Sequence, residues 1–167
     1  MKEVYLGLGS NLGDREKHLS NAVSLLSKEC GEVLQCSSIW ETEPWGFEAE
    51  TAFLNMAISI KTQLDVEEFF RVMHSIESRL GRERTGKGYC SRTIDIDVLF
   101  WGSEVINRNG IIIPHPAIQS RLFVLAPLNE IAAEVIHPVS KLSVTEMLNR
   151  CNDKSGIVKR PLSRPLP

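Results

Sequence analysis

The 167-residue sequence predicts an α+β protein, in which helices pack on one antiparallel sheet. Three observations predict this class. Segments with the apolar or alternating pattern of strands lie at residues 4–8, 32–42, 51–62 and 93–102. Two long segments, 10–30 and 65–80, carry apolar residues at helical spacing. Hydrophobic residues make up 43% of the chain and charged residues 24%, which suits a globular domain with a buried core.

The first strand is expected to end at Gly7 and Gly9 and to lead into a helix. Ser10 or Asn11 can cap that helix, and Asp14 lies in its first turn, where a negative charge is favourable. The strands at 32–42 and 51–62 follow, separated by the polar loop EPWGFEAE.

The helix at 65–80 has the clearest signals. Asp65 and Glu68 form a capping-box pattern at its start. After the strand at 93–102, a hairpin is expected to turn at Asn109-Gly110, a dipeptide that favours such turns. Shorter helices are expected at 120–132 and 143–151.

The core order is therefore β-α-β-β-α-β, the ferredoxin-like arrangement, followed by a hairpin and short helices. We expect one domain over residues 1–152. Residues 153–167 are basic and rich in proline without apolar periodicity, which predicts an extended tail.

Composition excludes several classes of protein. A net charge of −2 argues against a broad nucleic-acid-binding face. The four cysteines have neither zinc-site nor disulfide-framework spacing, which favours a reducing compartment. The N-terminus does not resemble a signal peptide, and no segment is long and apolar enough to span a membrane. We therefore expect a cytoplasmic protein with no membrane partner.

The segment SRTIDIDVLF, residues 91–100, combines a buried strand with two carboxylates. Residues two apart in a strand project to the same side, so Asp95 and Asp97 should lie together while Ile94, Ile96 and Val98 face the core. An amphipathic strand with one solvent-exposed face would explain this pattern. Alternatively, the pair faces a cleft and binds Mg²⁺, which prefers carboxylate oxygens together with substrate phosphates.

A basic, glycine-rich segment precedes this strand. GRERTGKG, residues 81–88, nearly matches a phosphate-binding P-loop, but Gly88 replaces the required hydroxyl and the segment leaves a helix instead of entering one. It is either a solvated basic loop or a loop that closes positive charge over an anion. The basic residues concerned are Arg82, Arg84, Lys87 and Arg92.

Three further polar residues are candidates. His74 and Glu77 lie at the edge of an apolar helix face and either make local hydrogen bonds or face the cleft beside the aspartate strand. His115, between two prolines, is either structural or a hydrogen-bond donor to a phosphate.

Seven segments occur together in a distinctive order. They are GLGSNLGD (7–14), TEPWG (42–46), FLN (53–55), LGRER (80–84), SRTIDIDVLF (91–100), IPHP (113–116) and RLFVLAPL (121–128). In them the chain closely resembles the 6-hydroxymethyl-7,8-dihydropterin pyrophosphokinase family of folate biosynthesis, over roughly residues 2–150. The chain departs from the family pattern at Gly88, at Cys90-Ser91 and at Pro116.

The resemblance implies an ATP-dependent transferase that moves a pyrophosphoryl group to the hydroxymethyl group of a reduced pterin and releases AMP. It implies two Mg²⁺ ions held by Asp95 and Asp97, with Arg82 and Arg92 as further catalytic residues. The implied ATP-binding residues are His74, Glu77, Arg82, Arg84, Lys87, Arg92, His115 and Arg121. The implied pterin-binding residues are Thr42, Pro44, Trp45, Phe53, Asn55 and Phe123. Without the resemblance, Phe53 and Phe123 would be read as core residues.

Two other classes of function remain as alternatives. A metal-dependent nucleotidyltransferase also places acidic pairs on a ferredoxin-like sheet, but would need a third carboxylate and a nucleic-acid groove. An RNA-binding module would need exposed sheet aromatics and a basic face, and aromatic residues make up only 7% of the chain. We expect a monomer that is not fused to another folate enzyme.

Overall fold

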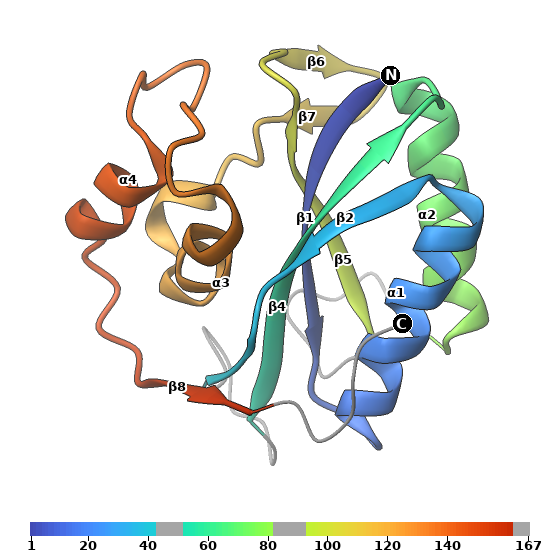
Figure 1. The fold of residues 1–167 in the computed structure, drawn as a ribbon, viewed down its shortest axis with the longest axis horizontal. Coiled ribbons are helices and arrows are strands. Elements are labelled where there is room, and N and C mark those ends of the chain that lie inside the picture. Colours follow the sequence, from blue (N-terminus) through green and yellow to red (C-terminus); the bar gives the residue numbers. More distant parts are fainter. Residues whose placement is uncertain (43–51, 82–92, 162–167) are drawn as a thin grey trace.

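The computed structural model describes residues 1–42, 52–81 and 93–161. Its main sheet is antiparallel, with the strand order β5-β1-β4-β3-β8, and β2 also pairs with β4 (Figure 1). The strands of this sheet are β1 (Lys2–Ser10), β2 (Glu32–Cys36), β3 (Ile39–Thr42), β4 (Phe53–Thr62), β5 (Asp95–Trp101) and β8 (Ile157–Arg160). The predicted α+β class is confirmed.

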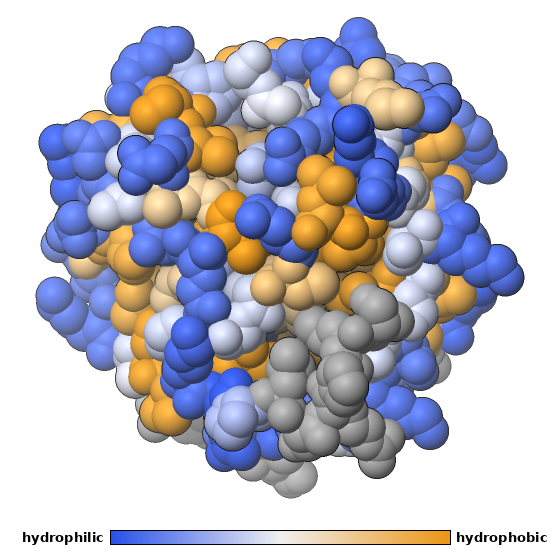
Figure 2. Space-filling model, viewed as in Figure 1, coloured by the Kyte–Doolittle hydropathy of each residue, from blue (hydrophilic) through white to orange (hydrophobic). Residues whose placement is uncertain are grey.

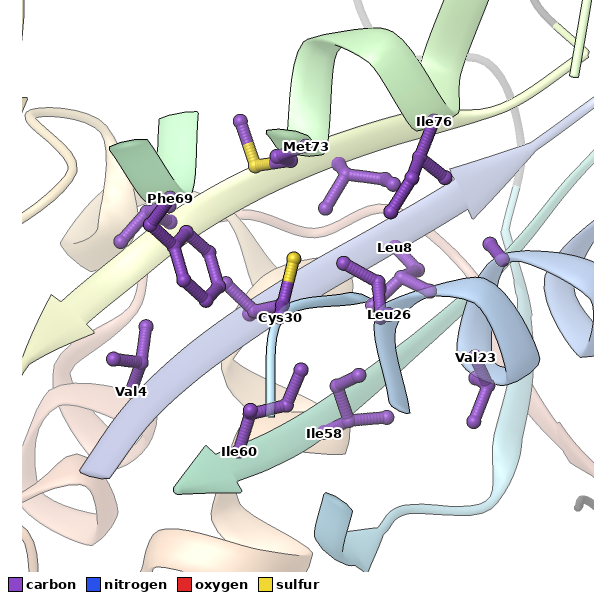
Figure 3. Close-up of a cluster of buried hydrophobic side chains, with 14 of the residues drawn as sticks. Val4, Leu8, Val23, Leu26, Cys30, Ile58, Ile60, Phe69, Met73 and Ile76 are labelled. Carbon is purple, nitrogen blue, oxygen red and sulfur yellow. The ribbon is translucent and has the colours of Figure 1, made fainter. Parts of the chain in front are cut away.

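One face of the sheet is covered by α1 (Arg15–Glu29) and α2 (Val66–Arg79), which lie side by side in Figure 1. Alternate residues of the strands point toward these helices and form the larger core. Figure 3 shows Phe69, Met73 and Ile76 of α2 in one buried cluster with Leu8 of β1 and Leu26 of α1. This buried packing anchors the central strands that carry the site.

The opposite face is covered in part by α3 (Leu122–Ala132) and α4 (Val144–Arg150). Leu125 and Leu128 of α3 are buried against Tyr5, Ala57 and Leu99 in a second core. Between β5 and α3 the chain forms the hairpin of β6 (Ile106–Arg108) and β7 (Ile111–Ile113), then the 3₁₀ turn η1 (Ile118–Ser120). The predicted hairpin turn is confirmed, because Asn109 and Gly110 both have positive φ.

Local differences from the expected elements have physical causes. The predicted strand at 32–42 is divided into β2 and β3 at Ser37, whose side chain accepts a hydrogen bond from the Ala57 amide. Helix α1 begins later than expected. Its N-cap is Asp14, which accepts from the Lys17 amide, whereas Ser10 still belongs to β1. The N-cap expected at Asp65 is confirmed by its bond from the Glu68 amide.

The C-terminal segment makes contacts that the sequence did not indicate. We expected residues 153–167 to be an extended tail, yet Ile157–Arg160 pair with β3 as the outer strand β8. This short strand has no buried residue, so its sequence shows no apolar face to predict it. Its place in the sheet depends on the backbone hydrogen bonds that it makes.

No helix in the described part of the chain is long and apolar enough to cross a membrane. Apolar side chains lie in separate groups among hydrophilic ones on the face shown in Figure 2. Cys30, Cys36 and Cys151 are free thiols.

Candidate active site

The two aspartates lie on β5 and project away from the α1–α2 core. Asp95 and Asp97 are partly exposed, whereas Ile94, Ile96 and Val98 are buried. The period of two in a strand therefore places both carboxylates on the face of the sheet that α3 occupies further along. The hydrophobic neighbours hold the strand and leave both aspartates partly exposed on its other face.

Two glycines of β1 lie beside the aspartates. Gly9 pairs with Asp95 and Gly7 with Asp97, and on its other side Gly9 pairs with Asn55 of β4. A Cβ atom at Gly9 would lie 3.1 Å from Asn55 Oδ1 and 3.8 Å from Phe53 Cδ1. A side chain at Gly9 would therefore crowd the Asn55 amide, on the β4 side of the strand.

This role of the glycines was missed at the sequence level, where Gly7 and Gly9 were expected to end the strand. Instead, β1 continues to Ser10. The available signal was the matching spacing of two glycines in one strand and two aspartates in another. Only the register between β1 and β5 shows that they are opposite each other.

Glu77 fastens α2 to the aspartate strand. Its carboxylate is buried, and Oε1 accepts a hydrogen bond of 2.9 Å from the backbone N–H of Ile96, which lies between the two aspartates. Strand β5 is the outer strand of the sheet, so this N–H points to the side where no neighbouring strand is described. His74, one turn earlier on α2, is partly exposed and contacts the Phe70 ring edge-on at 5.8 Å.

His115 brings an imidazole toward the same carboxylates. Its backbone N–H donates to Leu99 O, and its Nδ1 accepts from the Ala117 amide at 3.2 Å. Burial and the charge of Arg121 lower the pKa of His115 below 6.5, while the charge of Asp95 acts in the opposite direction. These groups are thus close enough to interact. A neutral ring whose Nδ1 accepts carries its hydrogen on Nε2 and can donate from there.

On the β4 side of Gly9 lie an amide side chain, Asn55, and an aromatic one, Phe53. Asn55 Nδ2 donates to Thr42 Oγ1 at 2.8 Å, and Phe53 pairs with Thr42 across β3 and β4. Phe53 is only partly buried, as is Phe123 at the start of α3, so neither is a fully enclosed core residue. The Arg121 guanidinium lies 5.8 Å from the centre of the Phe123 ring. The aromatic and cationic parts of the site therefore adjoin.

Several candidate residues lie outside the described part of the chain. They are Pro44, Trp45, Arg82, Arg84, Lys87 and Arg92. Strand β5 follows Arg92 in the sequence. It is anchored near its start, because Ser10 Oγ donates to the Thr93 carbonyl at 2.6 Å.

The donor set suits a hard divalent cation. Within residues 1–42, 52–81 and 93–161 there is no cluster of three or more His, Cys, Asp or Glu side chains that could form a complete protein cage. Mg²⁺ does not need one, since it usually binds one or two carboxylates and keeps its remaining positions for water and substrate phosphates. Asp95 and Asp97, which lie opposite Gly9 and Gly7 of β1, fit this requirement.

An antiparallel α+β fold with paired carboxylates, a histidine and an arginine beside an amide and aromatic region defines a class of phosphate-transferring enzyme. The particular family follows from comparison with known proteins. Residues 5–133 match the family model of 7,8-dihydro-6-hydroxymethylpterin-pyrophosphokinase (HPPK). The chain therefore belongs to the HPPK family.

Curated relatives agree with this assignment. The chain is 46% identical over 133 residues to the 2-amino-4-hydroxy-6-hydroxymethyldihydropteridine pyrophosphokinase of Bacillus subtilis (strain 168), covering 79% of each protein. It is 38% identical to the protein of that name from Aquifex aeolicus, covering 87% of this chain and 90% of the relative. It is also 38% identical to the folic acid synthesis protein fol1 of Pneumocystis carinii, but spans only 20% of that protein.

Solved structures show the same fold. A crystal structure of an HPPK-DHPS protein in complex with substrates matches with a TM-score of 0.72 at 16% identity, covering 89% of this chain. The wild-type Plasmodium falciparum HPPK-DHPS structure with SDX-DHP matches with a TM-score of 0.70 at 18% identity. The chain spans 43% of the length of each of these two proteins.

Proposed function

We propose that this protein transfers the pyrophosphoryl group of ATP to the hydroxymethyl group of 6-hydroxymethyl-7,8-dihydropterin, giving AMP and the pterin diphosphate ester in folate biosynthesis. The observation that carries the proposal is the position of Gly9, with Asp95 paired on one side and Asn55 on the other. This register supports the proposal, because adjacent strands bring carboxylates suited to metal-bound phosphates close to an amide suited to a polar ring. Family membership and the named relatives support the same reaction.

On the phosphate side, Asp95 and Asp97 would hold two Mg²⁺ ions, which neutralise charge on the triphosphate and orient the reacting oxygens. His115 donates a hydrogen bond from Nε2 to a phosphate oxygen, and Arg121 offsets negative charge. From α2, the partly exposed His74 would complete the nucleotide side, and the buried Glu77 would support it through its bond to the Ile96 N–H. Arg82, Arg84, Lys87 and Arg92 add positive charge from the segment before β5.

On the pterin side, the flat ring lies between the faces of Phe53 and Phe123, and the Asn55 amide binds its polar edge. The Asn55–Thr42 hydrogen bond fixes the orientation of that amide. Pro44 and Trp45 would contribute from the segment that follows Thr42.

The chemistry requires little covalent participation by the protein. The pterin hydroxyl attacks the β-phosphorus of ATP, the bond from that phosphorus to the oxygen of the α-phosphate breaks, and AMP leaves. The side chains position the two substrates and stabilise charge on the group that moves. We further propose that the protein is a cytoplasmic monomer.

The decisive experiment supplies ATP, Mg²⁺ and 6-hydroxymethyl-7,8-dihydropterin and identifies the nucleotide product. AMP should form in equal amount to the pterin diphosphate, and label placed on the β-phosphorus should move to the pterin. Formation of ADP would indicate ordinary kinase chemistry and would overturn the proposal, as would nucleotide turnover that does not depend on the pterin.

The rival nucleotidyltransferase reaction would release pyrophosphate and retain AMP on an acceptor, so the same assay separates the two. The net charge of −2 argues against the nucleic-acid groove that this rival would need. Among the described residues, the aspartate pair belongs to no group of three or more His, Cys, Asp or Glu side chains that could hold a metal ion.

A further inference from the structure

We propose that the C-terminal segment, residues 153–160, positions the pterin side of the active site by holding the start of α3 and the end of β3. This inference rests on the proposed function for its ligand. The segment lies beyond residues 5–133, which match the family model, and its sequence suggested only a tail.

Asp153 caps α3 from a distant part of the chain. The residue at the N-cap position of α3, Arg121, makes no side-chain capping bond. Instead, Asp153 Oδ2 accepts from the Leu122 backbone N–H at 2.9 Å. Leu122 lies between Arg121 and Phe123, so this bond fixes the turn that carries both site residues.

The Asp153 carboxylate is itself held in place. Its Oδ1 accepts from the backbone N–H of Ser155 at 2.9 Å and from Ser155 Oγ at 2.5 Å. Partial burial acts to raise the pKa of Asp153, but the bonds from Ser155 and Leu122 outweigh it and lower that pKa below its ordinary value. The group is therefore an ionised acceptor at neutral pH, with both oxygens engaged.

The proposed pterin site has two walls, the start of α3 on one side and the end of β3 on the other. Strand β8 supports the β3 wall. It pairs with β3 from Ile39 opposite Arg160 to Thr42 opposite Ile157. Thr42 is the last residue of β3 and accepts the hydrogen bond that orients Asn55. Without β8, the outer edge of β3 would lose its backbone partners at the end where the site lies.

Ion pairs reinforce this wall. Arg160 Nη2 contacts Glu41 Oε2, and Glu41 Oε1 also binds Arg15 Nη1 at 3.1 Å. Arg15 in turn donates to the carbonyl of Ala52 at 2.7 Å, directly before Phe53. This network links the end of β3, the start of β4 and the start of α1.

A third contact joins the two walls. Glu130 of α3 accepts from Trp40 Nε1 at 2.6 Å and from the Ser38 amide at 3.1 Å, and Lys159 Nζ lies 3.4 Å from Glu130 Oε2. The segment thus contacts the helix that carries Phe123 and the strand that carries Thr42. We infer that it sets the spacing between Phe123 and the Asn55–Thr42 pair.

The test uses two nearly isosteric substitutions in the full chain. Asp153→Asn replaces one of two acceptor oxygens with a donor, and Glu41→Gln removes the charge between Arg15 and Arg160. The matched control is Glu67→Gln, which removes a carboxylate that pairs with Arg108 near the β6–β7 hairpin, away from these contacts. Binding of 6-hydroxymethyl-7,8-dihydropterin is measured by fluorescence titration, with Mg²⁺ and an ATP analogue that has a methylene group between the α- and β-phosphorus.

We expect each test variant to weaken pterin binding by about tenfold, because small displacements of positioning groups have large effects. Binding of the ATP analogue should change by less than about twofold in Glu41→Gln, since its expected contacts lie mainly on β5 and α2. In Asp153→Asn it should weaken, but less than pterin binding, because the same turn also carries Arg121. Glu67→Gln should change neither affinity. A lower melting temperature with unchanged pterin affinity, or equal losses for both ligands, would overturn the inference.

Amide hydrogen exchange separates this inference from the proposed function. Exchange of the amides of residues 122–125 should accelerate in Asp153→Asn, and that of residues 41–42 in Glu41→Gln. If the wild-type protein bound no pterin and formed no AMP, the proposed function would fail, and the exchange data would still decide whether the segment holds these residues. Unchanged exchange in both variants would overturn it.

Discussion

Gly9 has the most demanding position in the site, because strands on both of its sides present functional groups to it. Asp95 is its partner on β5, and Asn55 is its partner on β4. A side chain here would occupy the space between the proposed metal and pterin sites. The requirement comes from close approach and not from an unusual backbone angle, since Gly9 is absent from the residues with positive φ.

We predict that Gly9→Ala raises the KM for the pterin by about tenfold while the fold is retained, because the new Cβ would lie 3.1 Å from Asn55 Oδ1 and displace it. Steady-state kinetics with each substrate varied in turn would measure this. Gly7→Ala is the comparison, since its Cβ would meet Leu99 at an ordinary 3.6 Å. An equal effect of both substitutions on the pterin KM would contradict the explanation.

The aspartates have a different role, which depends on charge. We predict that Asp95→Asn and Asp97→Asn each lower kcat at least about a hundredfold, because an amide cannot replace a carboxylate that holds Mg²⁺ against phosphate. Their melting temperatures should stay close to the wild-type value, since both side chains are partly exposed. Near-normal activity of both variants at ordinary Mg²⁺ concentrations would refute the metal assignment.

Among the elements, the contact between α2 and β5 determines how the aspartate strand is held at its outer edge. A buried backbone N–H costs free energy if it lacks an acceptor, and Glu77 supplies one to Ile96. The helix thereby supports the strand directly between the two aspartates. Its apolar side, with Met73 and Ile76, fixes α2 on the core at the same time.

Substitution of Glu77 separates this support from any role of its charge. We expect Glu77→Ala to lower the free energy of unfolding by about 1–3 kcal/mol, since it leaves the Ile96 N–H buried without its acceptor. Glu77→Gln can still accept that bond and should lose less stability. Urea denaturation measures both variants. If Gln were as destabilising as Ala, the hydrogen bond could not be the cause.

At the scale of the whole molecule, His137 and His115 both favour the neutral form, because folding buries the first and partly buries the second. His137 is 5% exposed, and its Nδ1 accepts from the amides of Val139 and Ser140. Burial lowers the pKa of His137 and is also the largest cause of the lowered pKa of His115. Both residues therefore couple unfolding to the uptake of protons.

The direction of the pH effect follows from linkage. Below pH 6.5 the unfolded chain takes up protons that the folded protein resists, so stability should fall as the pH decreases from 6.5 toward the folded pKa values. The slope is at most about 1.4 kcal/mol per pH unit for each histidine, and no loss from these groups is expected above pH 6.5. Urea denaturation at pH 7.5 and 5.5 should show the difference, with a smaller one in His137→Gln. Equal pH dependence in the two proteins would exclude His137 as a source.

The α+β class, the long helices, the hairpin turn at Asn109-Gly110 and the family could all be predicted from the sequence. These depend on local signals, namely periodicity, caps, turn residues and motifs. The sequence also predicted that Asp95 and Asp97 share a face, because that requires only the period of a strand. The roles of the candidate residues in catalysis and binding stay predictions.

Three features could not be predicted from the sequence and are seen only in the folded structure. They are the register of β1 between β4 and β5, the bond from Ile96 to Glu77 and the contacts of residues 153–160. Each of these joins parts of the chain that are distant in sequence, and no local pattern encodes such a partner. Strand β8 is the clearest example, since its side chains show no buried face. Backbone pairing and single charged contacts place it, and these are specific only once the rest of the sheet has formed.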